Sequence, residues 1–263
     1  MSGNLIKTRL TSTPLISTWR AAAIPAGLLL LWSAASHLGW VDANFLPAPE
    51  LVVERAWTQS RHGTLALDLG ASLLRDLSGF AIGSLAGIAT GLLLGFSETA
   101  RRLFGPLLRV HRQIALFAWV PLISVWMGSG EAGKITFIAL AAFQPNVTNS
   151  WQALRELPQR YRELAAVLTL SRLDFVRFIA LPATLPAIFT GLHAGLIYAW
   201  QATIAAELFM TIAPGLGGQM MEGRQLFQMD LVLVCILLLG LIGILFNKSA
   251  GFLETTLLRR RTT

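Results

Sequence analysis

The sequence has few charged residues and almost no cysteine. Only 13% of its 263 residues are charged and 54% are hydrophobic, whereas an ordinary soluble domain has about 25% charged residues. The single cysteine, Cys235, lies in an apolar run and is interpreted as a small buried apolar residue. One cysteine excludes an internal disulfide and argues against a zinc cluster, so no metal site is expected. These scarcities favour a membrane protein over a soluble enzyme.

The sequence has instead long apolar runs that alternate with short polar segments. A run of about 20 apolar residues is long enough to cross a membrane as a helix. The runs predict an all-α membrane protein, one transmembrane domain over 1–263, with about six spans near 21–41, 68–96, 103–127, 134–154, 184–210 and 230–252. The first run continues apolar to Val41, which favours a retained helix over a removed signal peptide.

The basic residues predict the orientation of these spans. Most of the 21 Lys and Arg residues fall in four segments: the N-terminus, 97–112, 155–177 and the tail from Lys248. Because such residues accumulate on the cytoplasmic side, we expect 1–20, 156–182 and 253–263 in the cytoplasm of a bacterium and 42–67 in the periplasm. Both termini are then cytoplasmic. The basic residues form no single patch, so membrane lipid is an expected partner and nucleic acid is not.

The segment between the first two spans carries its own pattern. FLPAPELVVERAW at 45–57 contains two prolines that interrupt regular structure. Glu50 to Arg61 follows with an amphipathic pattern, which predicts a short external helix.

Glycine recurs at every fourth position of the second span. The five residues are Gly79, Gly83, Gly87, Gly91 and Gly95. This spacing places them along one helix face, where the absence of side chains lets another backbone approach closely. A single pair of this kind is weak evidence, but five in register predict a tightly packed helix interface rather than a ligand site.

The segment from Arg160 to Pro182 is charged and amphipathic, although it lies between two apolar runs. Its apolar residues recur every three or four positions with a break near Ser171, and Ser171-Arg172-Leu173-Asp174 matches a helix-capping pattern. A short helix, a turn and a second short helix are therefore expected. Three roles are open: a helix resting on anionic headgroups, a DNA-binding helix-turn-helix, which the flanking spans disfavour, and a docking surface for a cytoplasmic partner.

The same segment resembles the EAA loop of ABC-importer permeases, whose pattern is roughly E-A-A-x-x-x-G followed by I-x-L-P. Glu163 and Ala165 match the first and third positions, and Ile179-Ala180-Leu181-Pro182 matches the end. Leu164 and Thr169 stand where alanine and glycine are usual, and Thr169 would be strained if that position has a positive φ. A resemblance to the permeases of sulfonate, taurine and nitrate importers extends over nearly the whole chain, through LPAP at 46–49, AWVPL at 118–122 and AAELF at 205–209.

The resemblance implies a type I ABC importer permease fold with a cytoplasmic coupling helix, working by alternating access. It implies as partners a second copy of the chain, two cytoplasmic ABC ATPase subunits and a periplasmic substrate-binding protein. ATP and Mg²⁺ would bind to the ATPase, this chain would bind no cofactor, and the substrate would be a small anion of the aliphatic sulfonate, taurine or nitrate class. The residues that it implies for coupling are Arg162, Glu163, Leu164, Ala165, Leu168, Thr169, Ser171 and Arg172.

One stretch imitates a nucleotide-binding motif. GSGEAGKI at 128–135 nearly matches the phosphate loop, but Ile135 replaces the required Ser or Thr and no strand precedes it. We interpret it as the external turn between two spans. The ATPase must then be a separate subunit.

Polar residues within spans are costly to bury, so they are candidates for a translocation path. The candidates are Arg112, Gln144, Gln201 and Glu207. Glu207 either lines or gates a path or forms an ion pair between helices, and for Gln144 and Gln201 packing within the bundle is the favoured interpretation. Arg112, near the inner end of the third span, could attract an anion.

Two other classes of protein were weighed against an importer subunit. An ion- or proton-coupled secondary transporter usually has inverted repeats and helices broken at the midplane, but the sequence shows no convincing repeat and such a transporter has no use for 160–178. A membrane-bound enzyme ranks last, because no nucleophile–base or carboxylate pair occurs at a usable spacing, and no catalytic residue is expected.

Overall fold

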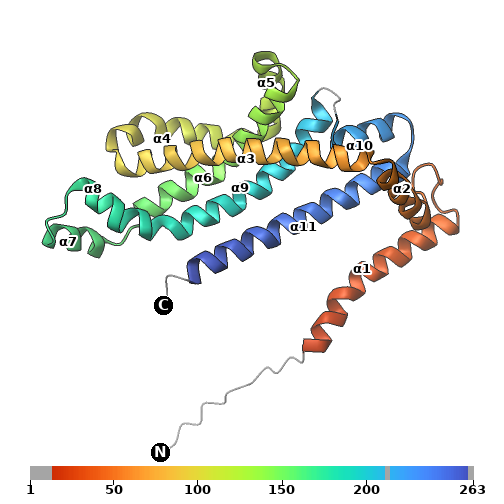
Figure 1. Cartoon of the computed structure of the whole chain (residues 1–263), viewed down its shortest axis with the longest axis horizontal. Coiled ribbons are helices and arrows are strands. Elements are labelled where there is room, and N and C mark those ends of the chain that lie inside the picture. Colours follow the sequence, from red (N-terminus) through yellow and green to blue (C-terminus); the bar gives the residue numbers. More distant parts are fainter. Residues whose placement is uncertain (1–13, 211–213, 260–263) are drawn as a thin grey trace, which may run out of the picture.

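The computed structural model describes residues 14–210 and 214–259, apart from the side chains of 14–22, Arg162, Arg172, Leu253 and 256–259. Every regular element in these residues is helical (Figure 1). The elements are α1 (Pro14–His37), α2 (Pro49–His62), α3 (Thr64–Phe96), α4 (Glu98–Gln113), η1 (Leu116–Trp119), α5 (Val120–Met127), α6 (Glu131–Arg155), α7 (Gln159–Val167), α8 (Arg172–Asp174), η2 (Phe175–Ala180), α9 (Leu181–Phe209), α10 (Leu216–Gln225) and α11 (Met229–Arg259). η1 is a 3₁₀-helix, and η2 is a π-helix that leads into α9.

Three helices are long and apolar enough to cross a membrane. They are Thr64–Phe96, Phe175–Phe209 and Met229–Phe252, which confirm the spans expected near 68–96, 184–210 and 230–252. The last helix continues as α11 to Arg259, so the first part of the expected tail is helical. Residues 1–13 of the expected N-terminal segment and 260–263 of the tail lie outside the described residues.

Two further expected spans are helical but shorter or less apolar. α6 covers the span expected at 134–154 and carries buried polar residues, among them Lys134 and Asn146. It accommodates them because it packs between α3 and α9. The span expected at 21–41 contains the shorter apolar helix Ala23–His37. By length and apolar composition, the described residues contain three spans, or four if one bent pair counts as a span, which is fewer than six.

The bent pair corrects the expected span at 103–127, which is two helices instead of one. α4 and the helical stretch Leu116–Met127 meet at an angle of 104°. The backbone is extended at Ile114 (φ −82°, ψ 125°) and at Ala115 (φ −59°, ψ 135°), and Pro121 starts the new helix, where its missing N–H costs nothing. The apolar residues on both sides concealed this break, although Arg112 and Gln113 directly precede it, because hydropathy does not report backbone conformation.

α3 and α6 form the closest helix pair of the fold. All five glycines of the α3 repeat lie against α6, and a Cβ atom at any of them would come closer to α6 than real Cβ atoms approach their neighbours. At Gly87, for example, it would lie 2.6 Å from the carbonyl oxygen of Phe143. The two backbones are therefore in direct contact along most of α3, which is the use of glycine expected in a membrane.

α9 packs against α3 and α6 and also holds α11. Its small residues Ala199, Ala202 and Ala206 form a buried cluster with Phe137 and Ile138 of α6. The indole N–H of Trp200 donates to the backbone carbonyl of Leu239 at 3.0 Å, which ties α9 to α11. α3, α6 and α9 thus pack against one another, and α11 joins this bundle through α9.

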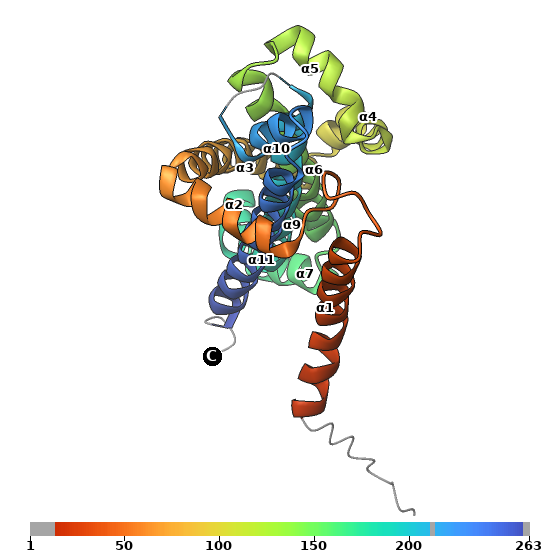
Figure 2. The same cartoon turned by 90° about the vertical axis from the view of Figure 1, so that its right-hand side faces the viewer.

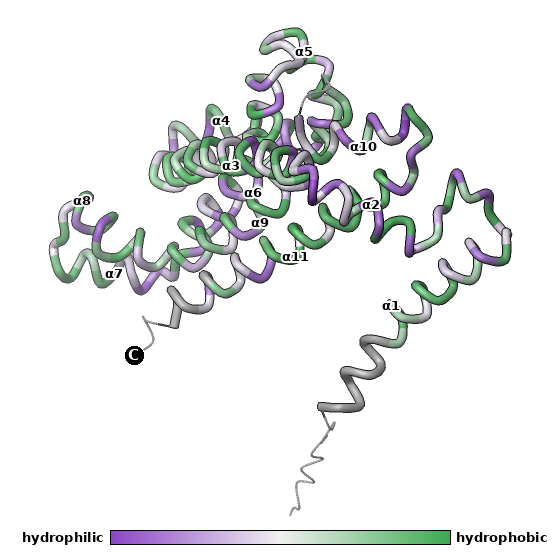
Figure 3. The backbone as a smooth tube through the Cα atoms, turned by 45° about the vertical axis from the view of Figure 1, so that its right-hand side comes forward, coloured by the Kyte–Doolittle hydropathy of each residue, from purple (hydrophilic) through white to green (hydrophobic). Residues whose placement is uncertain are grey.

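The bundle has two distinct ends. α2, α10 and the start of α11 gather at one, here called the α2 end, and α7 and α8 project from the other, the α7 end (Figure 1). α2 confirms the short helix expected at 50–61. α1 stands apart from the bundle in both cartoon views (Figures 1 and 2), and its apolar residues are exposed. Figure 3 shows hydrophobic residues along most of α11 and a mixture of both kinds in α7 and α8.

The glycine contact makes a direct prediction about stability. Gly83→Ala would push a methyl group against the carbonyl oxygen of Ala139, and overpacking of this kind destabilises by about 1–3 kcal/mol. Gly70→Ala is the matched control, because Gly70 lies on the same helix with no atom within 4 Å of its Cβ position. Thermal unfolding in detergent should show a lower melting temperature for the first variant alone. Equal melting temperatures would contradict the close contact.

Candidate functional site

Glu207 is buried in an ion pair near the α2 end. Its carboxylate is 2% exposed and accepts hydrogen bonds from Arg75 at 2.7 Å, from Ser72 at 2.8 and 3.0 Å, and from the backbone N–H of Gly217 at 2.8 Å. These partners belong to α3 and α10, whereas Glu207 belongs to α9. Of its two expected roles, the geometry shows the ion pair between helices.

The ion pair is part of a wider polar network. Arg75 also donates to Glu131, at the start of α6, at 2.6 and 2.7 Å. Asp68 accepts from the backbone N–H of Gly215 at 2.7 Å, and Ser72 accepts from that of Leu216 at 3.0 Å. These partners of Glu207 were not predicted from the sequence. The signal was present, because Asp68, Ser72 and Arg75 recur at helical spacing on one face of an apolar span.

A central cavity brings together two of the predicted path residues. It has a volume of about 420 Å³ and is bounded by α4, η1, α6 and α9. Arg112 and Gln144 line it, together with Trp119, Asn149 and Tyr198. Gln201 and Glu207 are not among the lining residues; Gln201 is exposed on α9.

The depth of this cavity corrects the expected position of Arg112. α4 starts beside the end of α3, and at about 1.5 Å per residue it carries Arg112 about 20 Å from its first turn. Arg112 therefore lies in the last turn of α4, at the end away from α3, where it lines the cavity with Gln144, halfway along α6. The extended residues Ile114 and Ala115 lie beside it. Non-helical backbone at membrane depth is tolerated where it lines a cavity or is buried in protein.

α7 ends in a left-handed turn at Thr169. The N–H of Leu170 donates to the carbonyl of Ala165 at 3.0 Å, and the N–H of Thr169 donates to that of Ala166 at 3.2 Å. This pair of bonds is the Schellman motif, in which the residue at position 169 takes a positive φ. Thr169 has φ +50°. A β-branched residue is strained in this conformation, where a glycine would not be.

The second short helix begins as its sequence predicts. The N–H of Asp174 donates to the hydroxyl oxygen of Ser171 at 3.2 Å, and that hydroxyl donates to the Asp174 carboxylate at 2.6 Å. These bonds confirm the helix cap at Ser171. α8 has only three residues before the π-helical η2 continues the chain into α9.

The α7–α8 segment exposes a set of apolar side chains. Leu164, Val167, Leu168 and Leu173 have exposed fractions of 47, 80, 55 and 76%. Glu163 is exposed beside them, and Ala165 is half-buried on the side that faces the start of α4. The side chains of Arg162 and Arg172 lie outside the described part of the structure. The exposed set has no partner in the described bundle, as a docking surface would require.

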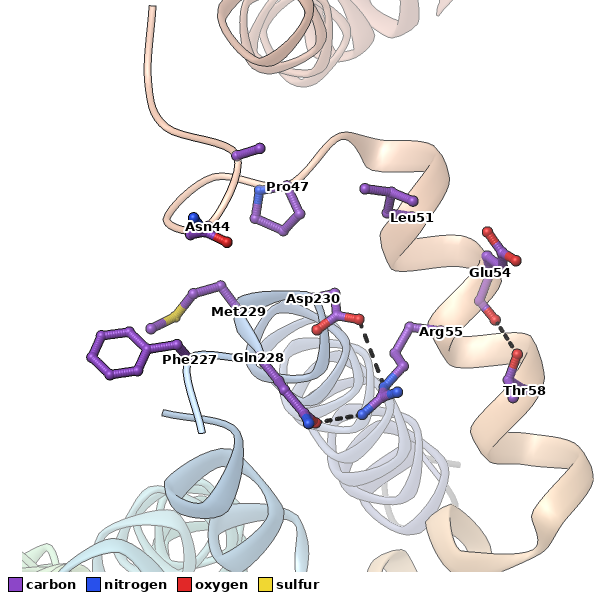
Figure 4. A pocket seen from close by; sticks show the side chains of 11 residues that line it. Asn44, Pro47, Leu51, Glu54, Arg55, Thr58, Phe227, Gln228, Met229 and Asp230 are labelled. Carbon is purple, nitrogen blue, oxygen red and sulfur yellow. Dashed lines mark hydrogen bonds and ion pairs between the residues drawn. The ribbon is translucent and has the colours of Figure 1, made fainter. Parts of the chain in front are cut away.

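A further pocket lies at the α2 end, between α2 and the turn from α10 to α11 (Figure 4). Arg55 of α2 crosses it, donating to the Gln228 side chain at 2.5 Å and lying 3.7 Å from the Asp230 carboxylate. These contacts fasten α2 to the start of α11. Among the described residues, no group of three or more His, Cys, Asp or Glu side chains is arranged to hold a metal ion.

Comparisons with known proteins agree on one family. The family model described as "binding-protein-dependent transport system inner membrane component" matches residues 81–262. The chain is 36% identical to a putative aliphatic sulfonates transport permease of Escherichia coli K12, over 90% of this chain and 89% of that protein. It is 35% identical to a riboflavin transport system permease of Chloroflexus aurantiacus (92% and 91% covered). It is 31% identical to the taurine transport system permease of E. coli K12 (88% and 86% covered).

Two solved structures share the fold. One is an inward-facing methionine ABC transporter, with a TM-score of 0.59 and 19% identity over 70% of this chain and 92% of that one. The other is an amino acid ABC transporter with histidines, with a TM-score of 0.63 and 13% identity over 76% and 96% of the two chains. The expected type I importer permease fold is therefore confirmed.

The buried ion pair makes a prediction about Glu207. Glu207→Gln leaves the guanidinium of Arg75 buried without its nearest buried carboxylate, and breaking such a pair costs about 3 kcal/mol. Glu131→Gln removes the other partner of Arg75, but the Glu131 side chain is 55% exposed, so we expect a loss of about 1 kcal/mol or less. Chemical unfolding of the two purified variants compares them. Equal losses in the free energy of unfolding would contradict the larger contribution to stability that we assign to Glu207.

The strained turn makes a second prediction. Thr169→Gly should stabilise the α7–α8 turn by about 1 kcal/mol, because glycine removes the cost of the left-handed conformation. Thr169→Ala keeps a Cβ atom and most of that cost. The measurement is the rate of tryptic cleavage after Arg172, which reports local opening and should fall about fivefold for the glycine variant. An equal fall for the alanine variant would show that backbone strain is not the cause.

Proposed function

We propose, because this chain belongs to the family of binding-protein-dependent transport system inner membrane components, that it carries a small anion through a bacterial inner membrane as one of two identical permease subunits. The chain is a component of an ABC importer and a multi-pass membrane protein of that membrane. Such components work with ATPase and substrate-binding subunits. The finer features of this proposal are orientation, coupling, path and substrate.

The orientation follows from the basic residues. The elements at the α7 end carry five arginines, which are Arg101 and Arg102 at the start of α4, Arg155 at the end of α6, Arg160 on α7 and Arg177 on η2. Basic residues collect on the cytoplasmic side of a membrane, so the α7 end and both termini are cytoplasmic. The α2 end, with α2 and α10, then faces the periplasm and the substrate-binding protein.

Coupling is carried by the exposed α7–α8 segment, and this single observation supports the proposal most directly. An apolar row bordered by charge is what a groove in a partner would receive. Glu163, Leu164, Leu168 and Thr169 lie on α7 and its turn, and Ala165 faces α4. Arg162, Ser171 and Arg172 complete the coupling set. η2 joins this segment directly to α9, so a displacement of α7 and α8 reaches a helix that lines the central cavity.

Alternating access would use the partners that the chain lacks. ATP and Mg²⁺ bind to the two ATPase subunits, whose closure favours one conformation of the permease pair. For this to drive transport, ATP and the substrate must each bind one conformation better than the other. The substrate passes through the central cavity past Arg112 and Gln144. Gln201 lies on the exposed face of α9, and it would face the path when a second copy of the chain packs there. Glu207 stabilises the α2 end of the bundle.

The substrate class is a small organic or inorganic anion. The related permeases are named for aliphatic sulfonates, taurine and riboflavin, so the names alone leave the substrate open. Arg112 favours an anion, because a cation at membrane depth needs a partner of opposite charge. A secondary transporter is disfavoured, because it gives the α7–α8 segment no role.

The first experiment identifies the partners. The tagged chain is extracted from native membranes in mild detergent, and copurifying proteins are identified by mass spectrometry. We expect an ATPase with Walker motifs and more than one copy of the tagged chain per complex. Recovery of the chain alone, together with uptake driven by the chain alone in vesicles, would overturn the proposal.

A substitution tests the coupling role. Glu163→Ala should lower uptake about tenfold, which corresponds to a docking contact worth about 1.4 kcal/mol, while the chain still inserts and assembles. Glu222→Ala is the control, because Glu222 is an exposed acid at the opposite end, on α10. Uptake and ATPase activity are measured in the same vesicles. Normal uptake by the Glu163 variant would refute the assignment.

A further inference from the structure

Three adjoining cavities follow α4 and α6 from the middle of the bundle to its α7 end. The first is the central cavity. The second, of about 90 Å³, shares Arg112, Gln144 and Thr148 with the first and is also lined by Arg109 and Trp151. The third, of about 460 Å³, shares Arg109 and Trp151 with the second and extends to the first turn of α4. Because neighbours share lining residues, we treat the three as one feature, the α4–α6 groove.

The α4–α6 groove is lined by unpaired cations at successive depths. Arg112 lines the first cavity and the second, and Arg109 and Arg155 line the second and third. Arg101 and Arg102, at the far end, are both paired with Glu98. No described carboxylate forms an ion pair with Arg109, Arg112 or Arg155. The middle of the groove therefore has positive charge that this chain does not neutralise.

α4 itself has two contrasting faces. Leu103, Leu107 and Val110 are 64, 63 and 62% exposed on its outer face. Arg109 and Arg112, three residues apart, lie on the face that lines the groove with α6. Charged residues at membrane depth face protein or a water-filled cavity, and they mark substrate or ion pathways. A helix that served only as a lipid-facing wall would not need this arginine face.

Two tryptophans add neutral donors to the groove. The indole N–H groups of Trp119 and Trp151 are buried and have no hydrogen-bond partner among the described residues. Trp119 lines the first cavity, and Trp151 lines the second and third. A buried donor without an acceptor costs about 1–3 kcal/mol. Because neither nitrogen is accessible in this conformation, each indole would have to turn toward the groove to donate to an anionic oxygen or a water molecule there.

We infer that the α4–α6 groove is the exit track along which a small anion leaves the central cavity for the cytoplasm. The inference rests on the proposed function, since it takes the α7 end to be cytoplasmic. Arg112, Arg109 and Arg155 each hold the anionic group weakly and pass it on, because conduction needs several sites that bind well enough to admit an ion and weakly enough to release it. A sulfonate, carboxylate or phosphate group has the required chemistry. The headgroup of an anionic lipid shares that chemistry and is the competing occupant.

Thiol labelling measures the charge of the groove without requiring transport. Gln152→Cys, in a Cys235→Ala background, places a thiol on the second cavity. The rate of labelling by the anionic reagent sulfonatoethyl methanethiosulfonate is compared with that of its cationic trimethylammonium analogue. We expect the ratio of the anionic to the cationic labelling rate to be about tenfold higher than in the same protein with Arg109→Gln and Arg155→Gln. The reason is that a cleft of one sign of charge concentrates counter-ions at least tenfold. Lys248→Gln, a cation lost from the exposed face of α11, should leave the ratio unchanged.

Two further measurements distinguish a transported anion from a lipid headgroup as the occupant, and test the exit track separately from the proposed substrate class. Labelling is done in vesicles of phosphatidylcholine alone and with added phosphatidylglycerol, and uptake of ethanesulfonate is measured for the same arginine variants in the reconstituted complex. If the groove is the exit track, the ratio of anionic to cationic labelling rates should not depend on phosphatidylglycerol. Uptake of ethanesulfonate should fall about tenfold when both arginines are replaced. A ratio abolished by phosphatidylglycerol, a ratio insensitive to the arginines, or unchanged uptake would each overturn it. If the unaltered complex takes up no ethanesulfonate, the proposed substrate class fails, whereas the labelling ratio still decides whether the groove attracts anions.

Discussion

The backbone contact between α3 and α6 is the constraint on which the rest of the fold depends. Lipid tails are as apolar as leucine, so helices in a membrane associate through close packing and hydrogen bonds rather than through the hydrophobic effect. Five glycines let α3 lie directly on α6, and α9 packs against both helices, with small residues facing α6. α6 is thereby covered by two helices, which bury its polar residues Lys134 and Asn146. The same residues would be costly on an outer helix.

In a bundle packed this closely, movement is confined to the segments that are joined to the central helices. The ion pair of Arg75 and Glu207 fastens α3, α9 and α10 at the α2 end, so the outer ends of these helices move together. The break at Ile114 and Ala115 and the π-helix between α8 and α9 interrupt regular hydrogen bonding elsewhere, and such interruptions are frequent at functional sites. The α4–α5 bend adjoins the central cavity, and the α7–α8 segment is joined through η2 to α9, which lines that cavity, whereas no residue of α3 lines it. The fold thus pairs a rigid centre with two places where the path can change.

Local features were predictable from the sequence, and long-range pairings were not. Glycine spacing, the cap at Ser171 and the helix α2 each depend on residues within one or two turns, where periodicity is informative. The break at 114–115 follows Arg112 and Gln113 directly and contains no glycine or proline, and the apolar residues on both sides of it still suggest a single span. Glu207 was identified as a buried acid, but its partner Arg75 lies 132 positions away and no local pattern connects them. Gln201 was singled out by residue type alone, and residue type does not tell which way a side chain faces.

The arginines show why residues that indicate membrane orientation can also include residues with a separate role in binding. In the sequence, Arg109, Arg112 and Arg155 count equally with Arg160 and Arg177 as residues that keep a segment on the cytoplasmic side. In the structure all five are exposed, but they line different surfaces: Arg160 lies on α7 and Arg177 on η2, whereas the first three line the groove between α4 and α6. Headgroup attraction accounts for a cation at the end of a helix, because a long side chain can reach the interface. Arg112 differs, because it lies beside Gln144, halfway along α6, where the anion that we propose for the groove would pair with it.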